Sequence, residues 1–169
     1  MTQQKKNLEI DMAKQRITQE SILEINIENQ YYTYAQILKN GLGYAFFDFK
    51  SNERLTDFSI LNTKKVLFII MVYNDVVTQG KWLKVGKLPI REDLIEQPFK
   101  YIQDVLNPNN FELYNPNTGK IIKATKDQCR GLECAAVYEA FHVEERIRDH
   151  FNGKVNIDRQ KDLDLFRDD

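Results

Sequence analysis

The stretch "ILEINIENQYYTYAQILKNGLGYAFFDFKSN" (residues 22–52) determines the fold that we expect. Apolar and polar residues alternate along it, and it is rich in Ile, Tyr and Phe, a pattern that favours strands. The dipeptides Glu28-Asn29 and Asn40-Gly41 interrupt the alternation and are typical of turns. We therefore predict three antiparallel strands, over residues 22–28, 31–38 and 44–50.

A continuous apolar run and one helical stripe complete the predicted fold. The run "VLFIIMVY" (residues 66–73) is typical of a strand that is covered on both faces. Ala140, Val143, Ile147 and Phe151 recur at three- and four-residue spacing, and Gly153 stands where a helix C-cap would be. We predict an α+β fold, a curled, mostly antiparallel β-sheet with a few helices that include this amphipathic helix near the C-terminus.

Shorter elements are predicted between these two stretches. Residues 91–97 lie between two prolines and predict a short helix. The segment "FKYIQ" (residues 99–103) predicts a strand, and "FELYNPNTGKIIKAT" (residues 111–125) predicts a hairpin. Residues 132–138 are small and apolar enough for a last buried strand or a tight packing segment.

The composition predicts one globular domain, because 42% of the 169 residues are hydrophobic and 29% are charged. We expect an N-terminal extension over residues 1–20 with a weak helical pattern over 8–17, the α+β domain over 21–153, and a charged tail over 154–169. The N-terminus has no apolar signal core, and the longest apolar run is far shorter than the about twenty residues of a membrane span. We therefore expect a cytoplasmic protein with reduced cysteines and no membrane association.

The charge is unevenly distributed along the chain. The formal net charge is −1, which does not favour nucleic acid as a partner. From Gly131 onward the chain has ten acidic and six basic residues, so this end has a net charge of −4 and the rest of the chain has +3. A solvated surface is the simpler interpretation of the acidic end, and attraction of a basic partner is the alternative.

The segment "GLECAAVYEAFHVEERIRDHF" (residues 131–151) is dense enough in ionisable groups to be tested for a metal site. Cys129, Cys134, His142 and His150 are the soft ligands, but their C-x4-C and H-x7-H spacing fits only half of the usual zinc pattern. On one helix, His142 and His150 would lie about 12 Å apart. We therefore expect neither a metal nor another cofactor.

Nucleophilic catalysis is a second hypothesis for the same segment. Cys134 with His142 and Glu145 could form a small hydrolase site, but no nucleophile elbow surrounds the cysteine. Glu144 and Glu145 precede Arg148 by four and three residues, the spacing of ion pairs on one helix face. We prefer a buried Cys134 under an ion-paired helix surface, and the hydrolase remains an alternative.

A nucleic-acid-binding sheet is the third interpretation, because aromatic residues can stack on bases. No basic residues interleave them, so core packing and cross-strand pairs explain them better. The residues concerned are Tyr31, Tyr32, Tyr34, Tyr44, Phe46, Phe47 and Phe49.

Three segments resemble the immunity protein 26 family of bacterial polymorphic toxin systems. They are "YYTYAQILKNGLGYAFFDF" (residues 31–49), "QGKWLKVGKLPI" (residues 79–90) and the 131–151 segment, so the resemblance spans residues 22–153. Its specificity lies mostly in the Gly-Leu-Glu-x-Ala-Ala-Val block with His142 and Arg146 after it. The chain departs from the family in "SILEINI", where a Gly-Asp pair opens the first strand, and in Tyr138, where the family has Trp.

The resemblance implies a small bacterial protein that binds and neutralises a cognate toxin domain by occlusion, without catalysis, cofactor, membrane or nucleic acid. A basic nuclease-type toxin is one possible partner. Glu133 and Arg146 are expected to form a partly buried ion pair that pins the last helix to the sheet. The family-signature positions, which we interpret as scaffold, are Trp82, Gly86, Gly131, Leu132, Glu133, His142 and Arg146.

Two kinds of residue are candidates for contact with the toxin. An acidic surface could steer and cover a basic active site, and exposed aromatic residues are frequent anchors of interfaces. The candidates are Glu139, Glu144, Glu145, Asp149, Tyr31 and Tyr32, with Tyr73 as a further exposed aromatic.

Overall fold

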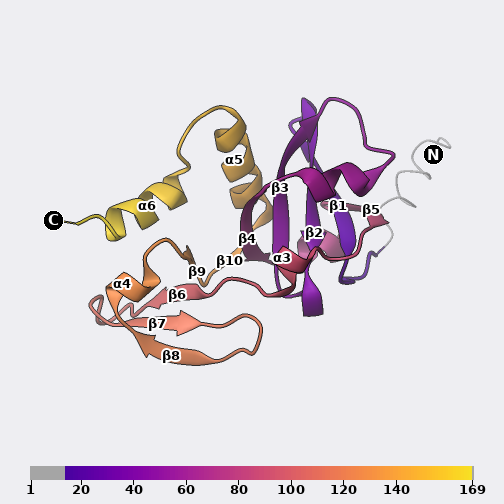
Figure 1. Ribbon diagram of the computed structural model, residues 1–169. Coiled ribbons are helices and arrows are strands. Elements are labelled where there is room, and N and C mark those ends of the chain that lie inside the picture. Colours follow the sequence, from indigo (N-terminus) through magenta and orange to yellow (C-terminus); the bar gives the residue numbers. More distant parts are fainter. Residues whose placement is uncertain (1–13, 169) are drawn as a thin grey trace.

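The computed structural model of the chain describes residues 14–168 and confirms the α+β class (Figure 1). In this range the strands form two sheets, one of six strands and one of four, rather than the single sheet that we expected. The helical pattern over residues 8–17 lies mostly outside the described residues, and residues 14–17 are not helical. None of the helices in the described range is both long and apolar enough to cross a membrane.

The six-stranded sheet has the order β10-β4-β3-β2-β1-β5, antiparallel throughout except that β10 runs parallel to β4. The three strands predicted over residues 22–50 and the apolar strand after them are confirmed. Glu28, Asn29, Asn40 and Gly41 adopt positive φ at the two predicted turns. The strands are β1 (Ser21–Ile27), β2 (Tyr31–Ile37), β3 (Tyr44–Ser51), β4 (Val66–Val72), β5 (Leu83–Lys87) and β10 (Val137–Tyr138).

Helices cover both faces of this sheet. One face buries Leu23, Phe46 and Trp82 against α5 (Ala140–Phe151), whose Val143 and Ile147 complete the core. The predicted amphipathic helix is thus confirmed, and Gly153 follows it with φ 69°. The opposite face is covered by the short helices η2 (Phe58–Thr63) and α3 (Glu92–Ile95). The remaining short helices in this part are η1 (Lys39–Gly41) and α2 (Asp75–Thr78).

The four-stranded sheet has the order β8-β7-β6-β9. The predicted hairpin forms β7 and β8, and β9 pairs parallel to β6. Pro98 stands between α3 and β6, where its ring cannot continue a helix or donate a hydrogen bond to a strand. The strands are β6 (Lys100–Gln103), β7 (Phe111–Tyr114), β8 (Ile121–Ala124) and β9 (Glu133–Cys134), with α4 (Lys126–Cys129) packed beside them.

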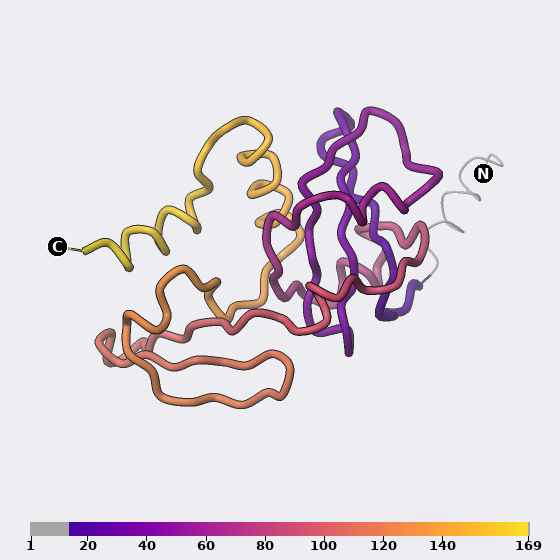
Figure 2. Tube along the Cα trace, in the orientation of Figure 1, coloured from indigo at the N-terminus to yellow at the C-terminus, as the bar shows by residue number. Residues whose placement is uncertain are grey.

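The end of the chain, which we described from its sequence as a charged tail, contains α6 (Ile157–Leu165). Phe166 follows this helix and is buried against the second sheet, with its ring 5.0 Å from that of Tyr101 in an edge-on contact. The Cα trace shows how residues 133–138 lead from the second sheet back to the first, through β9 and β10, before α5 begins (Figure 2).

Candidate functional site

The predicted ion pair between Glu133 and Arg146 is present where the two sheets meet. The two guanidinium NH groups donate to separate carboxylate oxygens of Glu133, over 3.1 and 2.6 Å. Both side chains are mostly buried, with 17% and 12% exposed. The guanidinium also lies 3.9 Å from the ring centroid of Phe68. The pair therefore ties β9 of the second sheet to α5 on the first.

Two further cations surround this pair. Arg159 of α6 lies 3.7 Å from Glu133, and the fully buried Lys100 donates to the carbonyl of Ile69 over 2.6 Å. Burial is the main reason that the pKa of Lys100 is lowered. Burial also opposes ionisation of Glu133, but its hydrogen bonds with Arg146 and the three nearby cations outweigh that and lower its pKa. The cluster holds the two sheets and α6 together.

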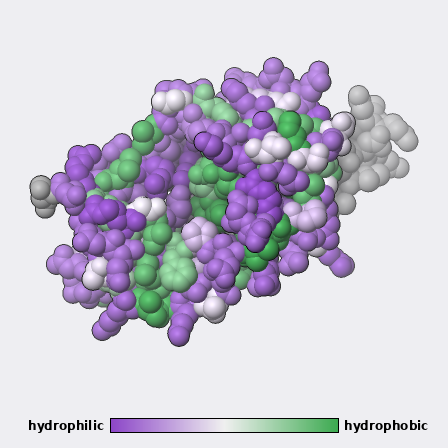
Figure 3. Space-filling view, in the orientation of Figure 1, coloured by the Kyte–Doolittle hydropathy of each residue, from purple (hydrophilic) through white to green (hydrophobic). Residues whose placement is uncertain are grey.

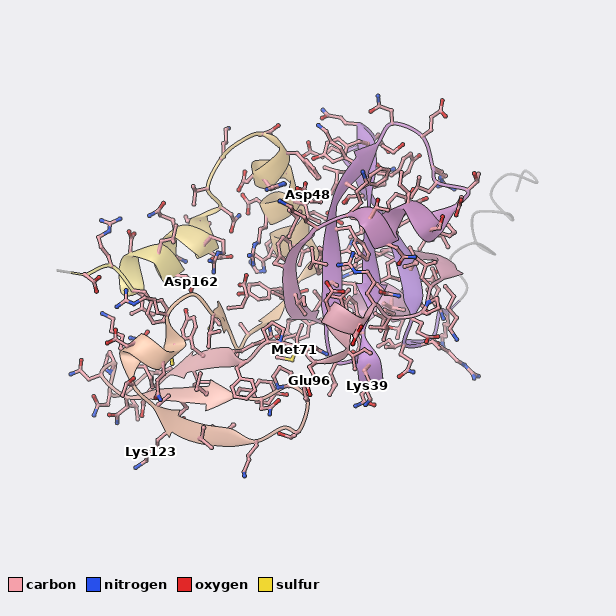
Figure 4. All side chains as sticks on the ribbon, in the orientation of Figure 1. Lys39, Asp48, Met71, Glu96, Lys123 and Asp162 are labelled. Carbon is pink, nitrogen blue, oxygen red and sulfur yellow. The ribbon has the colours of Figure 1, made fainter. Side chains whose placement is uncertain are left out.

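A groove of about 680 Å³ brings Cys134 and His142 to one surface, between the second sheet and α6. Burial raises the pKa of the Cys134 thiol, although a hydrogen bond with Tyr101 opposes this, so the reactive thiolate is disfavoured at neutral pH. The Tyr101 hydroxyl donates to Asp162 of α6, which lies above this sheet (Figure 4). Glu145 lines a different groove, so the three residues of the alternative hydrolase site do not line one groove.

The four soft ligands considered for a metal do not converge on one point, although Cys134 and His142 line the same groove. Cys129 is buried in the second core, and Cys134 lines the groove. The ring of His142 lies 4.0 Å from that of Phe141, and His150 Nε2 lies 3.0 Å from Asp48 Oδ1. Across residues 14–168, no three His, Cys, Asp or Glu side chains converge as metal ligands would.

The acidic candidates on α5 do not form one patch. Glu144 accepts a hydrogen bond from the indole of Trp82 over 2.9 Å, and Glu145 lies 4.0 Å from Arg148. Asp149 accepts a hydrogen bond from Asn156 at the other end of the helix. Glu139 stands at the N-cap of α5. Of the four acidic candidates, Glu139, Glu144 and Glu145 therefore lie at the N-terminal half of α5, and Asp149 lies near its C-terminus.

The two aromatic candidates make packing contacts. Tyr31 meets the ring of Phe151 edge-on at 5.6 Å, and Lys50 lies 5.1 Å above the Tyr31 ring. Tyr32 lies beneath Arg54, at 5.5 Å. Both tyrosines are half-buried. They contribute to the scaffold in the free protein, and less of each ring is available to a partner than the sequence suggested.

A hollow that the sequence did not reveal lies at the end of β4, beside the N-terminus of α5. It measures about 550 Å³, and its apolar lining includes Leu42, Met71, Tyr73 and Val137. Met71 lies where β4 approaches the second sheet (Figure 4). Hydrophobic surface gathers in the middle of the molecule, between the two sheets (Figure 3). The lining residues come from three separate parts of the chain, so no local motif could have indicated it.

Charged residues along α5 lie outside the hollow, and we call the hollow together with them the α5 face. Lys81 pairs with Asp75 of the hollow. This hydrogen bond is the main reason that the pKa of Lys81 is raised, and the charges of Asp75, Glu139 and Glu144 also raise it. A second groove, of about 270 Å³, adds Glu28, Glu145, Arg148 and the exposed Phe141. Five acids and two bases leave this face at −3; the acids are Glu28, Asp75, Glu139, Glu144 and Glu145, and the bases are Lys81 and Arg148.

One family model matches the chain. The family model of Immunity protein 26 matches residues 20–112, which is just over half of the 169 residues. The chain belongs to the immunity protein 26 family. No curated protein and no solved structure matched it.

The segment matched to immunity protein 26 runs from the start of β1 to the first part of β7. It includes Trp82 and Gly86 but ends before the 131–151 segment, so Glu133, His142 and Arg146 lie outside it. Trp82 is fully buried, and a Cβ on Gly86 would meet the Phe58 ring at 2.5 Å, so both positions serve packing. Gly131 adopts φ 81°, and Leu132 packs against the second core.

Proposed function

We propose that this member of the immunity protein 26 family binds a cognate toxin through the α5 face and blocks it by occlusion, without turning over a substrate. The observation that carries the proposal is an apolar hollow beside the N-terminus of α5 together with charged residues along this helix and around the hollow, which leave a net charge of −3. Action in the cytoplasm of a bacterium with a polymorphic toxin system is part of the same proposal.

The α5 face has the anatomy of a protein interface. Interfaces combine an apolar, aromatic centre with a polar rim, and a few aromatic anchors contribute most of the affinity. Tyr73 and Phe141 are 49% and 62% exposed and stand at the two parts of this face. The surrounding carboxylates would accelerate association with a basic surface, such as that around the active site of a nuclease-type toxin.

The proposal is tested by co-expressing the full chain with the toxin module encoded beside its gene. We expect the cells to survive and the two proteins to co-purify as a stoichiometric complex. Replacing Glu139 and Glu145 with Lys should weaken binding at least about tenfold, and less so at high salt. Glu53→Lys with Asp168→Lys, at exposed sites elsewhere, is the matched control and should change affinity less than about twofold.

Failure of the wild-type chain to protect or co-purify would overturn the proposal. Equal binding by the α5 variant and its control would refute the assignment to this face.

A hydrolase is the rival function, because Cys134 and His142 share one groove. The double variant Cys134→Ala, His142→Ala separates the two, because it leaves Glu145 and the other acids of the α5 face unchanged. Occlusion predicts that it still protects cells at the wild-type level, whereas loss of protection by a folded double variant would favour the enzyme.

A further inference from the structure

Two residues that line the hollow in the α5 face each have a buried side-chain oxygen without a hydrogen-bond partner. Within residues 14–168, four buried side-chain polar atoms lack a hydrogen bond, and two of them belong to residues that line this hollow. They are the hydroxyl of Tyr44, a residue that is only 2% exposed, and Oδ1 of Asp75. Buried polar groups are nearly always paired, so two unpaired oxygens at one hollow indicate a missing donor.

The chemistry of the hollow restricts what that donor can be. Burial raises the pKa of Tyr44 to about 12, so the residue is a neutral phenol that can accept a hydrogen bond. Asp75 uses its other oxygen to pair with Lys81, and Glu139 adds a second carboxylate to the lining. Leu42, Met71 and Val137 supply apolar walls.

A long basic side chain has both of the properties that this lining requires. Its methylene stem can lie along apolar walls while its charged head reaches the acceptors. The guanidinium of arginine carries five N–H donors in a planar fork, which suits several separate acceptors better than the compact ammonium of lysine. Lys81 reaches Asp75 from the surface and leaves Oδ1 without a donor.

We propose that the hollow is a socket for one basic side chain of the toxin, preferably an arginine, whose head is held by Tyr44, Asp75 and Glu139. The proposal rests on the proposed function and adds the chemistry of the contact. It also assigns Tyr44 a binding role, although the residue is buried in the free protein and belongs to its core.

Affinity of the full-length chain for the toxin module provides the first test. Tyr44→Phe removes only the hydroxyl and should weaken binding about tenfold, because a hydrogen bond to a charged group is lost. Its melting temperature should equal or exceed that of the wild type, since an unpaired buried hydroxyl is removed, and this excludes misfolding as the cause. Asp75→Asn should weaken binding at least as much, with Asp127→Asn as the matched control of equal charge change.

A small probe provides a second test that does not require the toxin. We expect N-acetyl-arginine methylamide to shift the backbone amide signals near Gly41, Met71 and Val137 in NMR spectra of the labelled chain. The citrulline analogue has the same shape without the charge and should cause little change, and Tyr44→Phe should reduce the arginine response.

The outcomes separate the two proposals. If the wild type binds the toxin but Tyr44→Phe and Asp75→Asn bind equally well, the socket is refuted and the immunity function stands. Equal responses to arginine and citrulline, or shifts elsewhere on the chain, also refute it. Absence of any toxin binding by the wild type would instead refute the proposed function.

Discussion

At the scale of single residues, Glu133 shows how a charged side chain comes to stand in an apolar block. Arg146 was predicted as its partner because the resemblance gives both residues as signature positions and because Glu133 is a charge in an otherwise apolar block. Lys100 and Arg159 could not be predicted as neighbours, since they reach Glu133 from β6 and α6. We expect a buried carboxylate that is surrounded by three cations to contribute strongly to the free energy of unfolding.

We predict that Glu133→Gln lowers the free energy of unfolding by about 2–3 kcal/mol at pH 7. Breaking a buried ion pair costs about 3–5 kcal/mol, and the residual exposure of both partners reduces this. The comparison is made by urea unfolding, with Glu53→Gln as an exposed control that should change stability by less than about 0.5 kcal/mol.

The effect of Glu133→Gln should depend on pH. The pKa of Glu133 is lowered in the folded protein, so its contribution to stability is complete above the unfolded value of about 4.3 and is lost as pH falls through the folded value. Lys100 stays protonated in both states in this acidic range and does not contribute to the change. A difference between wild type and variant that stays constant into strong acid would contradict this account of Glu133.

At the scale of elements, prediction from sequence succeeded where the signal was local. The strands β1 to β4 follow from alternation or a continuous apolar run, and α5 follows from its stripe and Gly153. The two-residue strands β9 and β10 pair with strands far away in sequence, so only the folded sheets reveal them. Helix α6 is short and rich in charge, and the aromatic ring that packs it against the second sheet, Phe166, comes after its end.

We predict that Phe166→Ala destabilises the second sheet selectively. Truncating a buried Phe costs about 3 kcal/mol or more, and its ring contacts Tyr101 and Phe111. Amide hydrogen exchange should therefore speed up in β6 and β7 and remain slow in β1 to β3. Leu163→Ala, at a half-exposed position of α6, is the control, and equal acceleration in both sheets would contradict selective destabilisation.

At the scale of the whole molecule, two sheets are joined by a small number of buried polar contacts. Lys100 binds the carbonyl of Ile69 across the junction, and Glu133 holds Arg146. The segment matched to the family contributes to both sheets but omits β10, which completes the first one. We propose on this basis that residues beyond 112 belong to the same unit, including α6.

The candidate site was only partly predictable, again because its residues lie far apart in the sequence. Glu139, Glu144 and Glu145 were proposed from their density. In the structure Glu139 lines the hollow, and Glu144 and Glu145 line a separate groove with Phe141. The hollow itself combines the turn before β3, the end of β4 and β10, which no local pattern connects.

Hydrogen exchange of the full chain, free and bound to its toxin, tests the α5 face most directly. We predict slower exchange on binding at residues 41–44, 71–75 and 137–145, and no change at the fully exposed hairpin tip of Val105 and Leu106. Protection confined to that tip or to β7 and β8, with the three segments unchanged, would contradict binding through the α5 face.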